Sequence, residues 1–127
     1  MEAFTINIPE SVIADLKNRI QNTRWPEEPE GSGWNYGTNE TYLKELTNYW
    51  VNDYNWKMHE QQLNQHPQYT TRIDGILIHF QYIRGKGSNP KPLILTHGWP
   101  DSYYRFHKII PLLTEGEQSF DLIIPSI

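Results

Sequence analysis

The chain has 127 residues, which is enough for one domain with a modest core, and 13% of them are aromatic. Its net charge of -4 and the absence of long basic runs argue against a nucleic acid or an anionic membrane as the main partner. The lack of cysteine excludes disulfides, zinc thiolates and a cysteine nucleophile. No signal peptide and no apolar stretch approaching the roughly 18 residues of a membrane helix are found, so we expect a cytoplasmic protein.

Apolar residues at helical spacing predict three helices in the first half of the chain. Ser11 is a candidate cap of the first helix, and an ordered but irregular loop from Arg24 to Gly37 follows that helix. The aromatic residues of the second helix are interpreted as core rather than as a ligand-binding platform. The helices are expected over Pro9 to about Thr23, from Thr38 or Asn39 to about Asn52, and over Trp56 to Gln65.

The period of the apolar pattern then changes from 3.6 to 2 residues, which is typical of strands. Two such runs, Tyr69 to Ile73 and Ile76 to Ile83, are separated by Asp74-Gly75, a strong hairpin signal. Asp74 is therefore read as a turn residue and not as a nucleophile.

The last part of the chain is expected to form a βαβ unit with a parallel pair of buried strands. A strand from Pro92 to Thr96 leads into a turn, a helix capped by Ser102 and running to Leu113, and a strand from Phe120 to Pro125. The fold class is thus α/β. Because the sequence stops directly after a strand, the fold is expected to be incomplete and the chain to be truncated.

The string His97-Gly98-Trp99-Pro100 follows the first of these parallel strands, at the sheet edge where ligands bind in open parallel sheets. The backbone N–H of Trp99 is a candidate oxyanion donor there. The alternative is that His97 and Trp99 only pack beneath a loop. A metal at His59, Glu60 and His66 is not expected, because the two histidines are seven residues apart.

The segment from Leu93 to Ser102, which contains this string, resembles epoxide hydrolases of the microsomal type. The likeness continues through Phe106 and Ile109-Ile110-Pro111, and further strings match the N-terminal region of that family. These are Phe4-Xaa-Ile6-Xaa-Ile8-Pro9, Asp15-Leu16-Lys17-Xaa-Arg19-Ile20, Thr23-Arg24-Trp25-Pro26, Tyr42-Leu43-Xaa-Xaa-Leu46-Xaa-Xaa-Tyr49-Trp50, Asn55-Trp56, Leu63-Asn64 and Ile73-Asp74-Gly75-Ile76-Xaa-Ile78-His79-Phe80.

The resemblance implies an α/β-hydrolase fold, with an N-terminal helical meander over residues 1–68 and the start of the catalytic core over residues 69–127. It implies hydrolysis of a small apolar epoxide to a diol, in detoxification, through an ester on an aspartate and without metal or cofactor. The amide of Trp99 would be one oxyanion donor, with His97, Gly98 and Pro100 giving the turn its geometry. The Trp99–Pro100 bond is expected to be cis. A homodimer is left open.

The string Gly-Xaa-Asp-Xaa-Gly, which would carry the nucleophile, does not occur in the sequence. The family places it, the base histidine, the charge-relay acid and the lid tyrosines beyond the last residue, so the 127-residue chain alone is expected to be inactive. Asp101 also stands where many relatives have glycine. A non-catalytic interaction module and a fragment of a haloalkane dehalogenase-like hydrolase are the alternatives.

Overall fold

The computed structural model describes residues 1–127, and the chain divides into two compact units. Unit 1 consists of Met1–Ile6 and His59–Ile127, and unit 2 consists of Asn7–Met58. No helix in either unit combines the length and the hydrophobicity needed to cross a lipid bilayer.

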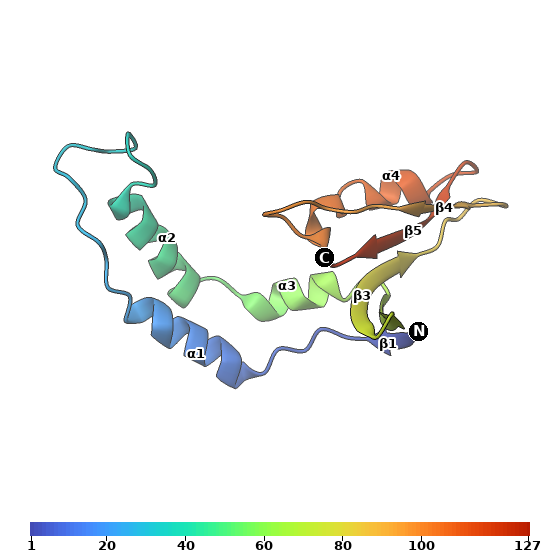
Figure 1. The fold of residues 1–127 in the computed structure, drawn as a ribbon, viewed down its shortest axis with the longest axis horizontal. Coiled ribbons are helices and arrows are strands. Elements are labelled where there is room, and N and C mark those ends of the chain that lie inside the picture. Colours follow the sequence, from blue (N-terminus) through green and yellow to red (C-terminus); the bar gives the residue numbers. More distant parts are fainter. The chain divides into compact units, whose positions relative to one another are not determined.

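Unit 1 is built on a mixed five-stranded sheet with the strand order β1-β2-β3-β5-β4 (Figure 1). The pair β4 and β5 is parallel, and the other neighbouring pairs are antiparallel. The predicted α/β class is therefore confirmed. The strands are β1 (Glu2–Phe4), β2 (Gln68–Ile73), β3 (Ile76–Ile83), β4 (Lys91–Ile94) and β5 (Phe120–Pro125).

The predicted hairpin is formed by β2 and β3, with Ile73 paired to Ile76 across the turn. Asp74 and Gly75 both lie in the left-handed region, with φ values of 51° and 82°. Two successive left-handed residues make the turn that matches the twist of the flanking strands. The Asp-Gly signal thus predicted the position of the hairpin turn correctly.

The connection between β4 and β5 contains two short helices where the sequence predicted one helix from Ser102 to Leu113. These are η1, a 3-10 helix (Tyr103–Phe106), and α4 (Ile110–Thr114). Pro111 lies in the first turn of α4, where a proline has no N–H to donate and where its ring would clash with a preceding helical turn. The prediction of a continuous helix was therefore wrong, and Ser102 makes no side-chain cap hydrogen bond.

The core of unit 1 lies between β5 and the helices that precede it. Leu122 and Ile124 of β5 are fully buried and pack with Ile110 of α4. β5 is thus buried on the face that carries Leu122 and Ile124, in line with the prediction, and strands flank it on both sides. β4 was also expected to be buried, but it is an edge strand, and Ile94 is 61% exposed.

β1 pairs with β2 and was not predicted, because three residues are too few to show a periodic pattern. The segment that follows β1 is held by the Asn64 side chain, which bonds the backbone of Ile6 in the way that a neighbouring strand would. The Asn64 amide accepts a hydrogen bond from the Ile6 backbone N–H at 3.0 Å and donates one to the Ile6 carbonyl at 2.8 Å.

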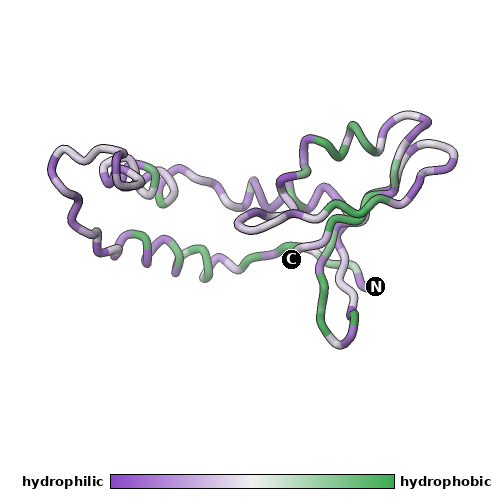
Figure 2. Tube along the Cα trace, turned by 45° about the horizontal axis from the view of Figure 1, so that its top comes forward, coloured by the Kyte–Doolittle hydropathy of each residue, from purple (hydrophilic) through white to green (hydrophobic).

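Unit 2 contains α1 (Glu10–Gln21), α2 (Glu40–Asn52) and the start of α3 (Trp56–Leu63), which continues into unit 1. Turns of α1 alternate between hydrophobic and hydrophilic residues, as expected of an amphipathic helix (Figure 2). Asn39 caps α2 at the predicted start of this helix, its side chain accepting from the Tyr42 N–H at 3.0 Å. Ser11 does not cap α1, because Pro9 takes the cap position and Ser11 lies within the helix.

The loop from Arg24 to Gly37 contains no helix or strand and is ordered by Glu28, in line with the sequence prediction. The Glu28 carboxylate accepts a hydrogen bond from the Ser32 hydroxyl at 2.8 Å and one from the Glu40 backbone N–H at 3.0 Å. Glu28 thus fastens the loop to the amino end of α2, where backbone N–H groups lack helical partners.

The aromatic stripe of α2 is not buried, which corrects its interpretation as core. Tyr42, Tyr49 and Trp50 are 43–51% exposed, and Val51 is the buried residue of this helix. Two helices and a loop supply too little surface to cover both sides of such a stripe. It lines an apolar groove of about 570 Å³ against α1 instead.

Candidate functional site

The turn His97-Gly98-Trp99-Pro100 lies just beyond β4, at the carboxyl end of the parallel strand pair. Sheet pairing reaches as far as Leu95, whose N–H donates to the Ile123 carbonyl at 3.0 Å. The turn is closed by a hydrogen bond from the Asp101 N–H to the Gly98 carbonyl at 2.9 Å. The Trp99–Pro100 peptide bond is cis, as expected.

Trp99 is the most exposed residue of the turn, with 97% of its surface accessible. Its side chain therefore packs on nothing in this structure, which argues against a packing role. Its backbone N–H has no hydrogen-bond partner, and Pro100 after it has no N–H to compete. The turn thus presents the Trp99 amide at the sheet edge without a partner, as an oxyanion donor requires.

His97 is buried, in contrast to its neighbour, and both of its ring nitrogens are engaged. Nδ1 lies 3.2 Å from the Gly98 carbonyl oxygen, and Nε2 lies 3.3 Å from the Ile127 backbone nitrogen. His97 therefore joins the turn to the residue that follows β5. The alternative of a packing role fits His97 in part, since the residue is buried, but its contacts are polar.

The turn borders a shallow hollow of about 320 Å³ that is lined by Gly98, Trp99, Pro100, Asp101 and Arg105. The Asp101 carboxylate accepts a hydrogen bond from the Ser102 backbone N–H at 2.8 Å and also pairs with the Arg105 guanidinium. The Ser102 N–H, followed by the Arg105 bond, lowers the pKa of Asp101 below its ordinary value. The ion pair of Asp101 and Arg105 thus stands at the rim of the hollow.

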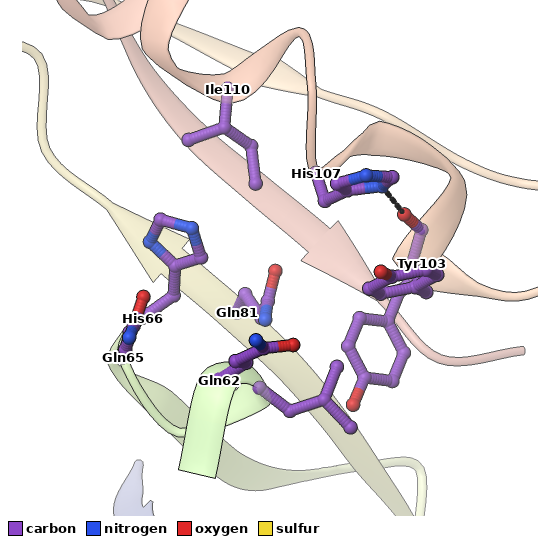
Figure 3. Close-up of a pocket in the computed structure, with 9 residues that line it drawn as sticks. Gln62, Gln65, His66, Gln81, Tyr103, His107 and Ile110 are labelled. Atoms are coloured by element: carbon purple, nitrogen blue, oxygen red, sulfur yellow. Dashed lines mark hydrogen bonds between the residues drawn. The ribbon is translucent and has the colours of Figure 1, made fainter. Parts of the chain in front are cut away.

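A second pocket, of about 290 Å³, lies elsewhere in unit 1 and is shown in Figure 3. The pocket is lined by the side-chain amides of three glutamines and by three ring side chains: Gln62, Gln65, Gln81, His66, Tyr103 and His107. Burial lowers the pKa of His66 and raises the pKa of Tyr103, which favours the uncharged form of each. The pocket is lined by hydrogen-bonding groups, and it contains no pairing of a nucleophile with a base.

His79, whose orientation the sequence left undecided, belongs to a polar network. Its Nδ1 lies 2.8 Å from the Ser126 hydroxyl, and its Nε2 lies 2.8 Å from the Gln68 side-chain oxygen. Burial lowers the pKa of His79. The Ser126 N–H also donates to the His79 carbonyl at 2.9 Å, so the chain after β5 is held firmly.

Sequence reasoning found the residues of the turn but missed what holds it. The contact of His97 with Ile127 joins two segments 30 positions apart, and its donor is a backbone N–H that has no side-chain signature. The pairing of Asp101 with Arg105 was detectable, because residues four apart with opposite charges often pair. No group of three or more His, Cys, Asp or Glu side chains is placed to hold a metal ion.

The comparisons with known proteins point to one family. A sequence model described as "Epoxide hydrolase N terminus" matches residues 1–106. A protein of Stigmatella aurantiaca named "Putative epoxide hydrolase" is 42% identical over 98% of the chain. "Epoxide hydrolase 1" of Oryctolagus cuniculus is 38% identical over 98% of the chain.

Two solved structures are similar along nearly the whole chain. The epoxide hydrolase of Aspergillus niger gives a TM-score of 0.89 at 28% identity and covers 99% of this chain and 34% of its own. The juvenile hormone epoxide hydrolase of Bombyx mori gives a TM-score of 0.90 at 36% identity and covers 98% of this chain and 31% of its own. The chain also spans 30% of the length of the two curated relatives.

Proposed function

The chain belongs to the family of epoxide hydrolase N-terminal regions, and from that membership we propose that it is the front part of an enzyme that adds water to epoxides. In this assignment residues 1–68 form the N-terminal meander and residues 69–127 begin the catalytic core. The observation that carries the proposal is the free N–H of Trp99 at the carboxyl edge of the parallel strands.

The proposed reaction has two covalent steps. In the first, an aspartate carboxylate oxygen attacks an epoxide carbon, the ring C–O bond breaks, and the ring oxygen takes a proton from a tyrosine. In the second, a histidine removes a proton from water, whose oxygen attacks the carbonyl carbon of the resulting ester. The released alkoxide takes the proton from the histidine and leaves as the diol. The aspartic acid then loses its proton, and the tyrosine regains one through solvent.

The Trp99 amide acts in the second step. Negative charge gathers on the ester carbonyl oxygen when water attacks, and an N–H aimed at that oxygen stabilises the charge. Gly98 leaves open space beside the amide, and Pro100 and the Asp101–Gly98 hydrogen bond fix the turn. We assign the nucleophile, the base, its carboxylate partner and the tyrosines to the part of the enzyme that follows this segment.

The substrate that we propose is a small apolar epoxide, with water as the second reactant. The relatives reported above are all named as epoxide hydrolases, so neither the dehalogenase alternative nor the interaction module is favoured. A homodimer, a role in detoxification and a cytoplasmic location stay predictions.

The test uses the longest reading frame that encodes this segment, with styrene oxide as substrate and the diol as readout. Trp99→Pro removes the amide proton, and Trp99→Ala keeps it while removing the same side chain. We expect Trp99→Pro to lower kcat by about 100- to 1,000-fold, the usual effect of losing one oxyanion donor, and Trp99→Ala to lower it much less.

Mass spectrometry of the acid-quenched enzyme separates a folding defect from loss of the donor. The ester should still form in Trp99→Pro and should accumulate, because only its hydrolysis is impaired. A parent protein without epoxide hydrolysis would refute the proposal. Equal losses in the two variants would remove the Trp99 amide from the mechanism.

A further inference from the structure

The side-chain amide of Gln81, on β3, is buried but has no partner in the protein. The residue is 3% exposed, and neither its amide nitrogen nor its amide oxygen makes a hydrogen bond to another residue. Every side-chain nitrogen and oxygen that is fully enclosed in this structure does have a partner. The Gln81 amide must therefore border open space, which is the pocket of about 290 Å³ drawn in Figure 3.

Gln68, which pairs with Gln81 across the β2–β3 ladder, shows how a buried amide is bonded when it stabilises the fold. It is also 3% exposed, but its nitrogen donates to the Leu63 carbonyl at 2.9 Å, and its oxygen lies 2.8 Å from Nε2 of His79. A buried polar group without a partner is unfavourable, and an apolar side chain of similar size would avoid that penalty. The contrast between the two glutamines indicates that the missing partner of the Gln81 amide is a ligand.

The pocket has the size and the mixed lining of a small-molecule site. Its volume of about 290 Å³ lies at the lower end of the range for such sites, roughly 300 to 1,000 Å³. Ile110, which is 3% exposed, contributes a buried apolar surface. The rings of Tyr104 and His107 stack with their centroids 4.3 Å apart and contribute a flat one. The pocket can thus hold an apolar group together with a hydrogen-bonding one.

The lining of the pocket also favours an uncharged ligand. None of the lining residues is Lys, Arg, Asp or Glu. Burial lowers the pKa of His66 and raises the pKa of Tyr103, so the uncharged form of each side chain is favoured at neutral pH. A charged ligand would lose its hydration here without finding an acid, a lysine or an arginine to pair with.

The Gln81 amide specifies the hydrogen-bonding pattern of the ligand. Whichever way the amide is turned, it offers an acceptor oxygen and an NH2 donor side by side. A ligand that bonds to both must itself have a donor next to an acceptor. The adjacent hydroxyls of a vicinal diol meet this requirement, and so do the carbonyl and the NH2 of a carboxamide.

We propose that this pocket binds a small uncharged molecule with a donor and an acceptor side by side next to an apolar group, and that the Gln81 amide is its main hydrogen-bonding contact. Vicinal diols and carboxamides share this chemistry. The pocket has no lining residue in common with the hollow beside Trp99. A diol is also what the proposed reaction releases, so the diol case, and only that case, rests on the proposed function.

Two matched substitutions in the full-length gene product separate ligand binding from folding. Gln81→Leu removes the unpartnered amide at similar size, and Gln68→Leu removes the bonded amide opposite it. We expect Gln81→Leu to keep or raise the melting temperature, because an unsatisfied polar group is lost, and Gln68→Leu to lower it. A melting temperature that falls as far in Gln81→Leu as in Gln68→Leu would show that the Gln81 amide belongs to the fold, and would overturn the proposal.

NMR of protein labelled with nitrogen-15 in its glutamines measures binding at the pocket itself. The side-chain NH2 signal of Gln81 is assigned by its loss in Gln81→Leu. Styrene glycol and benzamide are the two probes, and benzoate is the control, because it has the shape of benzamide but carries a negative charge and no N–H donor. We expect the Gln81 signal to shift with styrene glycol, with benzamide or with both, and not with benzoate.

The same titrations state what would overturn the proposal and which ligand it concerns. A shift with one probe alone identifies the diol or the amide as the ligand, and we expect Gln81→Leu to weaken the binding of that probe about tenfold, the usual effect of losing one or two hydrogen bonds. No shift with either probe, or an equal shift with benzoate, would overturn the proposal. A parent protein that binds benzamide but hydrolyses no epoxide would refute the proposed function and leave the pocket assignment standing.

Discussion

Gly98 and Gly87 are both glycines close to a sheet edge, but the structure gives them opposite reasons to lack a side chain. A Cβ on Gly98 would meet no atom within 4 Å, and its backbone is not left-handed. A Cβ on Gly87 would overlap the backbone carbonyl of Glu117. The fold therefore requires a glycine at 87, whereas at 98 the open space lies beside the Trp99 amide.

We predict that Gly98→Ala and Gly87→Ala have inverse effects. Gly98→Ala should leave the melting temperature of the full-length gene product near that of the parent but lower epoxide turnover, because the new methyl group enters the hollow where the ester carbonyl would lie. Gly87→Ala should lower the melting temperature. Unchanged turnover in Gly98→Ala, with the protein folded, would show that nothing approaches the turn on that side.

For single residues, the sequence predicted which residues form the candidate site but not the contacts that they make. The motif named His97, Gly98, Trp99 and Pro100, and the family resemblance supplied the cis bond. The partners of His97 could not be predicted, because they are a carbonyl and an N–H of the backbone. Such groups are the same in every residue, and only the fold brings them together.

The hairpin of β2 and β3 is the element that the sequence predicted best. Asp74-Gly75 combines two residue types that tolerate the left-handed region, and apolar alternation on both sides fixes the register. Local chemistry was sufficient here because both strands and their turn are contiguous in the chain.

Replacing Gly75 by alanine tests this explanation. The residue has a φ of 82°, where a Cβ costs about 1–2 kcal/mol, and no neighbouring atom lies within 4 Å of it. We expect Gly75→Ala to reduce the free energy of unfolding of the full-length gene product, measured in urea, by about 1–2 kcal/mol. Asp74→Asn is the control, since asparagine also accepts the left-handed region, and its effect should be small. Two equal effects would rule out backbone strain as the cause.

The elements that were predicted wrongly depend on long-range or steric information. β1 is recognisable only through its pairing with β2, which lies more than 60 residues later. The helix before β5 is interrupted at Pro111, a signal present in the sequence but outweighed by an apolar spacing that suits a continuous helix. The exposure of β4 follows from its position at the sheet edge, which no local pattern reveals.

At the scale of the whole molecule, the main feature is that these 127 residues leave large apolar side chains exposed to solvent. Ile94 on the edge strand β4 is 61% exposed, and Leu112 on α4 is 78% exposed. An edge strand presents unpaired N–H and C=O groups to other chains, and exposed apolar side chains add to that tendency. The relatives that the chain matches are about three times as long.

We predict that these 127 residues, expressed alone, associate with one another through the β4 edge. Sedimentation analysis should show oligomers in the parent segment and a lower mean mass in Ile94→Lys, because a charge on an edge strand opposes pairing. Leu112→Lys adds the same charge away from the edge and should change the mean mass less. A parent segment that sediments as a monomer would contradict the prediction.

The pairing of β1 with β2 has a consequence for biosynthesis. Phe4 pairs with Gln68, so the first strand leaves the ribosome long before the strand that it needs. At about 5–20 residues per second, the delay is on the order of several seconds. Throughout that interval unit 2, which lies between the two partners in sequence, can already form its helices. The pairing of β1 with β2 then closes a chain loop of more than 60 residues, and such late closure of distant contacts is a slow step of folding.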